Sequence, residues 1–220
     1  MRKSRILILA TAIFSIFNFQ FSICSAQITH TSAGAVDETA AKVLGKASDR
    51  MNSGSFRVPV TVVNYDANKK ETFRQQVTIT YKSPCYKVVA DGIELWCDGT
   101  TLWQVNNDTR EVVIDKMSAS DDDITNPAAL LANYQKNYRP KFIREENGTS
   151  IIDLQPKKGR TFHKIRLFIE TATGRLKKIE QHNYDSSRGE YTFGKYTPVK
   201  IAVEAFKYTA PKGYEIVDMR

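Results

Sequence analysis

Few residues of this 220-residue chain combine the types and the spacing that chemistry at a site requires. His30, His163 and His182 lie far apart in the sequence and lack the close spacing of zinc ligands. Glu94 and Glu111 are candidates for a hydrolytic pair of carboxylates, yet nothing around them distinguishes them from other acidic residues. The sequence has no Gly-x-Ser-x-Gly motif, and no glycine-rich phosphate loop follows an expected strand. We therefore expect a protein that is not an enzyme, with no catalytic residue, no metal site and no cofactor.

A run of three aspartates, Asp121–Asp123, raises the question of a calcium site. An EF-hand loop needs acidic residues at alternate positions and a distal glutamate, and this pattern is missing. Asn126 and Pro127 follow, and they are typical of a helix start, where the helix dipole favours acidic side chains. We expect these aspartates to precede a helix rather than to bind calcium.

Cys85 and Cys97 flank the Asp91-Gly92 turn almost symmetrically. A hairpin register that opposes them is one residue away from the simplest two-residue turn, so a disulfide is one interpretation. In an oxidising compartment it would contribute about 3 kcal/mol by restricting the unfolded chain. The other interpretation is a pair of small buried apolar side chains, and the sequence leaves both open.

The first residues indicate export from the cytoplasm. The chain begins MRKSR, continues with an apolar run over Ile6–Ile23, and has small residues up to Ala26. This pattern predicts a secretory signal peptide, residues 1–26, followed by a flexible polar leader, residues 27–35. An uncleaved membrane anchor and a lipid-modified Cys24 are the alternatives, and Ile23 is unfavourable for the second.

Composition and charge describe a globular protein. Hydrophobic residues make up 41% and charged residues 25% of the chain, and its formal net charge is +8. Loss of Arg2, Lys3 and Arg5 with the signal peptide lowers the charge to +5. Basic residues alternate with apolar ones along expected strands, which indicates solvated strand faces and no nucleic-acid partner. A mild attraction to anionic membrane surfaces remains allowed.

Short strands dominate the expected elements. Val77–Val113 reads as an antiparallel meander, because Asp-Gly pairs separate its alternating apolar runs. Its alternation puts Tyr86 on one face, and Trp103 is expected on a lining strand after the next turn. Further strands are expected on both sides of it, at the following ranges: 56–62, 73–81, 141–145, 150–154, 163–169, 176–183, 190–195, 201–208 and 215–219.

Two helices complete the expected domain, residues 36–220. Apolar residues recur at helical spacing over Val36–Met51, and Asn126-Pro127 opens AALLANYQKNY. Ten or eleven strands with two helices predict an α+β, mainly β fold: one large curved antiparallel sheet, closed or half closed, with the helices covering its mouth. An apolar concave face under a helical lid suits an apolar ligand.

Three motifs in order resemble the periplasmic outer-membrane lipoprotein carriers of the LolA type. They are the run Tyr81–Tyr86 around Pro84, the D-G-x-T-x-W-like run Asp98–Val105, and the ending Phe206–Arg220, which is similar to F-x-F-x-x-P-x-G-x-x-V-x-D-x-R. The Asn126-Pro127 helix stands where that family has its second lid helix. The resemblance covers residues 36–220.

The resemblance implies a monomeric periplasmic chaperone with an unclosed β-barrel and a helical lid. Such a protein takes acylated lipoproteins from an inner-membrane ABC transporter, shields their acyl chains, and delivers them to the outer membrane, where a receptor is a further expected partner. The side chains expected to form the acyl cavity and lid are Phe56, Val58, Val60, Phe73, Tyr86, Trp103, Leu130, Leu131 and Tyr134.

One position departs from the family pattern, and one alternative function fits the same scaffold. The family often has an arginine directly before this proline, where it contacts the lid; here that position is Ser83, with Lys82 one place earlier, so the role of the arginine does not transfer. The alternative function is a periplasmic lipid-binding sensor or structural module on the same scaffold, which would hold its ligand without handing it on.

Overall fold

The computed structural model describes residues 37–117 and 126–220. The predicted signal peptide and leader, Cys24, His30 and the run Asp121–Asp123 lie outside these residues. Within the described part of the chain, no helix is long and apolar enough to span a membrane.

Strands make up most of the described residues. Two α-helices, α2 (Glu38–Asn52) and α3 (Pro127–Asn137), and one short 3₁₀ helix, η1 (Val203–Phe206), accompany them. The strands are β1 (Ser55–Tyr65), β2 (Glu71–Lys82), β3 (Cys85–Val89), β4 (Ile93–Cys97), β5 (Thr101–Asn106), β6 (Glu111–Lys116), β7 (Tyr138–Glu146), β8 (Thr149–Pro156), β9 (Phe162–Glu170), β10 (Leu176–Asn183), β11 (Arg188–Phe193), β12 (Thr197–Pro198) and β13 (Glu215–Asp218).

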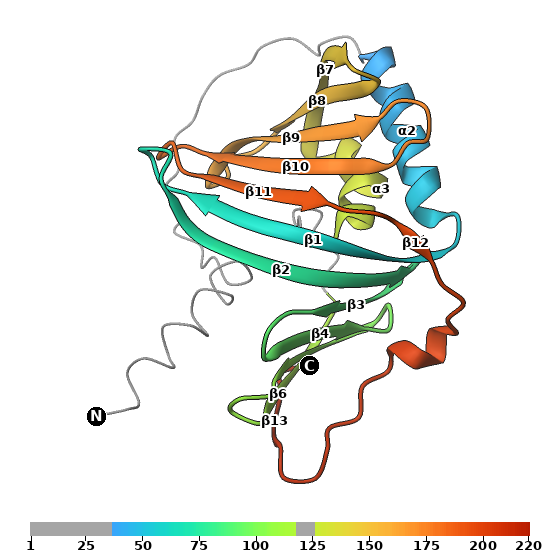
Figure 1. Ribbon diagram of the computed structural model, residues 1–220, viewed down its shortest axis with the longest axis vertical. Coiled ribbons are helices and arrows are strands. Elements are labelled where there is room, and N and C mark those ends of the chain that lie inside the picture. Colours follow the sequence, from blue (N-terminus) through green and yellow to red (C-terminus); the bar gives the residue numbers. More distant parts are fainter. Residues whose placement is uncertain (1–36, 118–125) are drawn as a thin grey trace. The chain divides into compact units, whose positions relative to one another are not determined.

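All of these strands belong to one sheet. Its order is β13-β6-β5-β4-β3-β2-β1-β11-β10-β9-β8-β7, with β12 paired to β1 beside this path (Figure 1). Neighbouring strands are antiparallel except β13 and β6, which are parallel. The order ends at β13 and β7, which do not pair, so the sheet is unclosed. The predicted meander corresponds to β2–β6, and the expectation of a mainly β fold with one large open sheet is confirmed.

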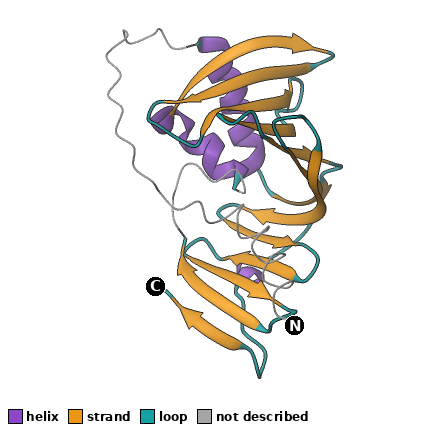
Figure 2. Cartoon of the chain, turned by 90° about the vertical axis from the view of Figure 1, so that its left-hand side faces the viewer, coloured by secondary structure: helices purple, strands orange, loops and turns teal. Residues whose placement is uncertain are grey.

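The sheet has two faces, which the strand registers define. Residues directly opposite each other on paired strands point to the same face. We call the face that carries Ile152, Leu167 and Ile179 the inner face, and the face that carries Asp153 and Arg166 the outer face. Both helices lie within the curve of the strands (Figure 2). Six apolar side chains on the inner face of β8–β10 are fully buried beneath them: Ile152, Leu154, Ile165, Leu167, Ile169 and Ile179.

One predicted strand, residues 201–208, is wrong. The chain there forms η1 and extended loops, and β12 ends at Pro198. Alternating apolar residues predicted a strand, but no neighbouring strand pairs with this segment. Instead its Phe206 is fully buried, and the Ile201 carbonyl accepts a hydrogen bond from Lys82 Nζ at 2.8 Å. The segment therefore packs across the sheet rather than extending it.

Candidate functional site

Helix α2 is bound to β7 through its N-cap residue. Asp37 Oδ1 accepts a hydrogen bond from Ala40 N at 2.9 Å, which caps the helix. Asp37 Oδ2 accepts one from Phe142 N in β7 at 2.7 Å. These backbone donors hold the pKa of Asp37 below its ordinary value. One carboxylate thus starts the helix and attaches it to the edge strand of the sheet.

The second half of α2 is bound to the turn between β9 and β10. Lys46 Nζ donates to the carbonyls of Thr171 and Ala172 at 2.8 and 2.7 Å. Gly174 in the same turn has φ +73°, and a Cβ there would lie 2.7 Å from Lys46 O. The buried side chains between these attachments share one side of the helix: Ala40, Leu44, Ala47 and Met51.

Helix α3 supplies three of the predicted lid residues. Asn126 Oδ1 accepts from Ala129 N at 3.1 Å and caps the helix, which Pro127 begins. Leu130, Leu131 and Tyr134 are all buried, as expected for residues that cover an apolar face. α3 packs against α2 and β7. The described contacts thus place both helices at the β7 end of the sheet.

The inner face continues from under the helices onto β1, β2 and β3. The register places Val58 opposite Ile79, and Ile79 opposite Val88. Five of the predicted site residues share this face by the same registers: Phe56, Val58, Val60, Phe73 and Tyr86. The structure therefore brings together the predicted residues of the first three strands.

The inner-face residues of β1–β3 differ in their solvent exposure. Val58, Val60 and Tyr86 are buried, whereas Phe56 and Phe73 keep part of their surface exposed. Further half-buried apolar residues on the same face, which the site prediction omitted, are Val77, Ile79 and Val88. Their signal was present in the sequence, because Val77 and Ile79 continue the alternation of Phe73 along β2.

An aromatic cluster at one end of β1 was also missed. The Phe56 ring lies 5.4 Å from Tyr81 and 5.0 Å from Tyr196. The Tyr196 hydroxyl donates to the Leu176 carbonyl at 2.9 Å, and burial raises the pKa of Tyr196. Tyr196 follows β11 in a loop, so strand periodicity gave no signal for it.

The placement of Trp103 differs from the prediction. It lies opposite Trp96, on the outer face, so it does not share a face with Tyr86. The turn between β4 and β5 decides this, because Asp98 Oδ1 accepts from Thr100 N and Thr101 N at 3.0 and 2.8 Å. That turn sets Leu102, not Trp103, opposite Cys97. The tryptophan motif therefore belongs to the outer face of the sheet.

The neighbouring Trp96 shows what covers this part of the outer face. Its ring lies 5.5 Å from Tyr208 and has Lys87 Nζ above it at 3.8 Å. Lys82 also points this way, to Ile201 O. Lys82 is thus bound to the C-terminal segment on the side away from the helices, and it does not replace an arginine that contacts the lid.

Cys85 and Cys97 are buried free thiols. The structure thus agrees with the interpretation as small buried apolar side chains and not with a disulfide. Tyr86 rather than Cys85 lies opposite Cys97. Cys97 Sγ lies 3.5 Å from Met117 Sδ, and burial raises the pKa of the Cys97 thiol to about 11. This thiol is therefore protonated at neutral pH.

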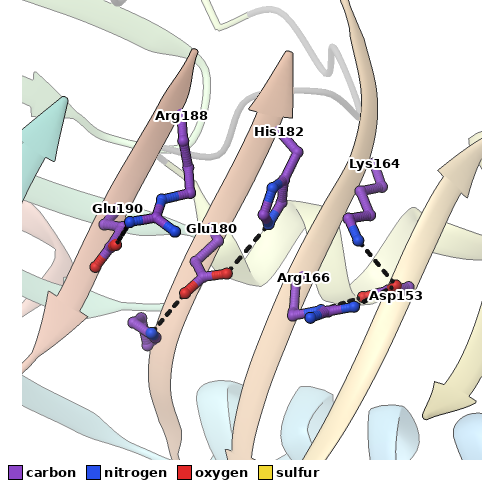
Figure 3. A network of polar contacts seen from close by, with 8 residues as sticks. Asp153, Lys164, Arg166, Glu180, His182, Arg188 and Glu190 are labelled. Carbon is purple, nitrogen blue, oxygen red and sulfur yellow. Dashed lines mark hydrogen bonds and ion pairs between the residues drawn. The ribbon is translucent and has the colours of Figure 1, made fainter. Parts of the chain in front are cut away.

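Charged side chains gather on the outer face of β8–β11, on the side opposite the helices (Figure 3). Arg166 binds Asp153 through Nε and Nη2 at 2.6 and 2.9 Å. Glu180 binds Lys178 at 2.5 Å and His182 at 3.1 Å. Burial alone would raise the pKa of Asp153, but Arg166 and Lys164 outweigh it and the pKa is lowered. The carboxylates are held as paired ions, which suits a structural role better than proton transfer.

Metal binding has no support in the described residues. Across 37–117 and 126–220, no three His, Cys, Asp or Glu side chains are grouped as metal ligands. Glu94 bonds to Trp96 Nε1 and pairs with Lys87 at 2.9 Å. Glu94 therefore faces away from the helices, and the candidate site is the apolar inner face.

Comparison with known proteins identifies one family. The model of the outer membrane lipoprotein carrier protein family LolA matches residues 75–209. No curated protein sequence matches the chain significantly. The matched residues begin within β2 and include β3–β12, α3 and η1, and thus most of the sheet that carries the inner face.

Solved structures share the fold at low sequence identity. An uncharacterised conserved protein from Thermus thermophilus has a TM-score of 0.59 at 11% identity, covering 82% of this chain and 99% of its own. A LolA superfamily protein from Nitrosomonas europaea gives 0.45 at 15%, covering 77% and 97%. The Pseudomonas aeruginosa MucA/MucB complex gives 0.43 at 13%, covering 78% and 62%. The first of these supports the fold alone.

Proposed function

The chain belongs to the LolA family of outer membrane lipoprotein carrier proteins, and from this membership we propose that it binds the acyl chains of lipoproteins on its inner face and carries them from the inner to the outer membrane. It acts in the periplasm, after removal of residues 1–26. An inner-membrane ABC transporter supplies the cargo, and an outer-membrane receptor accepts it. Its role is binding and transfer, not catalysis.

The observation that carries this proposal is the half-buried apolar stretch of the inner face. The helices pack on β7 at one end of the sheet, whereas Phe73, Val77, Ile79 and Val88 on β2 and β3 remain partly exposed. An ordinary core would bury these side chains completely. Apolar side chains on the concave side of an open sheet offer a surface on which a hydrocarbon chain can displace water.

Physical chemistry explains why a carrier is needed and why its site is open. Each exposed CH₂ group costs about 0.8 kcal/mol, so a chain of roughly sixteen carbons costs about 13 kcal/mol in water. Unaided passage through the periplasm is therefore negligible. A carrier must recover most of this free energy and still release the chain, which favours a partly open site with a movable lid.

Binding is tested with two neighbouring residues of β2 that point to opposite faces. Val77→Glu puts a charge on the inner face, whereas Thr78→Glu puts the same charge on the outer face. A fluorescent fatty acid should bind the wild type and Thr78→Glu alike, and Val77→Glu at least about tenfold more weakly, because the chain would contact a carboxylate. Equal binding by both variants, with both still folded by circular dichroism, would exclude the inner face as the acyl site.

The sensor alternative differs only in the fate of the ligand. A sensor would bind the fatty acid through the same inner face but would not release lipoproteins from a membrane. Binding alone therefore does not separate the two functions, and a transfer assay does.

A further inference from the structure

At one end of the sheet, basic side chains come from β7, from the loop between β8 and β9, and from β9. β7 begins there and β8 ends there, since Tyr138 pairs with Pro156. β9 begins and β10 ends at the same end, since Phe162 pairs with Asn183. We call the following group of side chains, which this arrangement brings together, the basic end: Arg139, Lys157, Lys158 and Lys164.

The charges of the basic end are poorly compensated. Arg139, Lys157 and Lys158 are exposed, and none of them forms an ion pair with another residue of the described ranges 37–117 and 126–220. Lys157 Nζ donates to the Gln135 carbonyl, which fixes its position without neutralising it. Lys164 shares the single carboxylate of Asp153 with Arg166.

Two carboxylates near this end, within the described part of the chain, bind other groups. Asp185, in the turn between β10 and β11, accepts hydrogen bonds from Ser187 N and Oγ at 2.9 and 2.6 Å. Glu190 pairs with Arg188 on β11. Asp185 keeps its negative charge, but neither carboxylate pairs with Arg139, Lys157 or Lys158, whose charges stay exposed to solvent.

An exposed tyrosine stands beside these charges. The Tyr184 side chain is 70% exposed, although its backbone N–H reaches Thr161 O at 3.5 Å. Its ring lies 5.7 Å from His163, which precedes Lys164. A tyrosine with an apolar ring and a polar hydroxyl is the kind of side chain that is favoured at the level of lipid headgroups.

We propose that the basic end docks the protein on the anionic headgroup surface of a phospholipid bilayer, with Tyr184 entering the headgroup layer. Long basic side chains on a loop adapt to fluid headgroups, and each contributes to the attraction. A protein interface would need an apolar centre, and among the described residues Tyr184 is the one exposed large apolar side chain at this end. The docking uses side chains outside the inner face, so it does not depend on acyl binding.

The test is co-sedimentation of the mature protein with phosphatidylcholine vesicles that contain or lack phosphatidylglycerol. The key variant, Arg139→Gln/Lys157→Gln/Lys158→Gln, loses three exposed charges and keeps side chains that can still donate. The matched control, Lys195→Gln/Lys200→Gln/Lys212→Gln, loses three exposed charges elsewhere on the chain. Both variants have the same net charge, so a difference between them reports position.

The proposal predicts binding to the anionic vesicles only, weakened by salt. Each charge of the basic end is worth roughly a factor of five, so the key variant should bind about 100-fold more weakly than wild type and the control much less so. Tyr184→Ala should weaken binding several-fold. Equal loss in both triple variants would show that net charge alone matters, which would overturn the proposal. No binding to anionic vesicles would also overturn it and would leave an acidic protein as the partner.

The result of the vesicle assay does not depend on the proposed function. The fluorescent fatty acid should bind the double variant Arg139→Gln/Lys158→Gln as tightly as wild type, because neither position lies on the inner face and the hydrogen bond of Lys157 to α3 is kept. Loss of vesicle binding with intact fatty-acid binding thus concerns docking alone.

Discussion

Single side chains decide how the helices are held on the sheet, and Asp37 does so twice. Its carboxylate caps α2 and also binds Phe142 N on the edge strand β7. Asp37→Ala should lower the free energy of unfolding by about 1–3 kcal/mol, because two backbone N–H groups lose their acceptor. Urea unfolding measures this. Asp49→Ala, at an exposed position of the same helix, serves as the control, and an equal loss there would contradict the assigned role.

The lowered pKa of Asp153 predicts how the stability of the protein changes at acid pH. Its folded-state pKa lies below the ordinary value near 3.8, owing to Arg166 and Lys164. The stabilisation is therefore present above the unfolded-state pKa and is lost as the pH falls through the folded one. Asp153→Asn should be less stable than wild type at pH 7 by about 2 kcal/mol, and the gap should close below about pH 4. Chemical denaturation at a series of pH values checks this, and a gap that is constant with pH would refute the assignment.

Several site residues could be predicted from the sequence, and the exceptions have physical reasons. Phe56, Val58 and Val60 alternate along one strand, which is sufficient to place them on one face. Trp103 was misplaced because its face depends on the hydrogen bonds of Asp98 in the preceding turn, and alternation cannot be carried across a turn of unknown length. Tyr196 lies in a loop, where no periodicity exists.

At the scale of elements, the close contact between α2 and the β9–β10 turn is the feature most sensitive to substitution. Gly174→Ala would place a Cβ 2.7 Å from Lys46 O at a positive φ. It should cost about 1–3 kcal/mol of stability. Gly159→Ala, where nothing lies within 4 Å, should change stability by less than about 0.5 kcal/mol. Thermal unfolding of both variants tests this, and similar melting temperatures would contradict the contact.

The two helices were predicted correctly because their local sequence signals agree with the way they pack. Helix α2 has apolar residues at helical spacing, and α3 starts with Asn126-Pro127, so both were expected close to their observed bounds. The segment 201–208 alternates like a strand, yet the sheet offers it no partner, and Phe206 packs as part of a 3₁₀ turn instead. Pairing partners are a tertiary property that a single sequence does not contain.

At the scale of the whole chain, one open sheet separates three surfaces. The inner face is apolar and partly covered by α2 and α3. The outer face of β8–β11 is held by ion pairs, and the outer face near Trp96 is covered by the C-terminal segment. The sequence predicted the open sheet and its helices, but the division of faces required the strand registers.

The inner face is proposed to carry lipoproteins away from a membrane, and a release assay tests this most directly. Purified mature protein is added to spheroplasts of the source bacterium, and the supernatant is examined for lipoproteins bound to it, with Val77→Glu and Thr78→Glu compared side by side. We predict release by wild type and Thr78→Glu, and little or none by Val77→Glu. No release by the wild type, while it still binds a fluorescent fatty acid, would contradict the carrier function and favour a lipid-binding sensor.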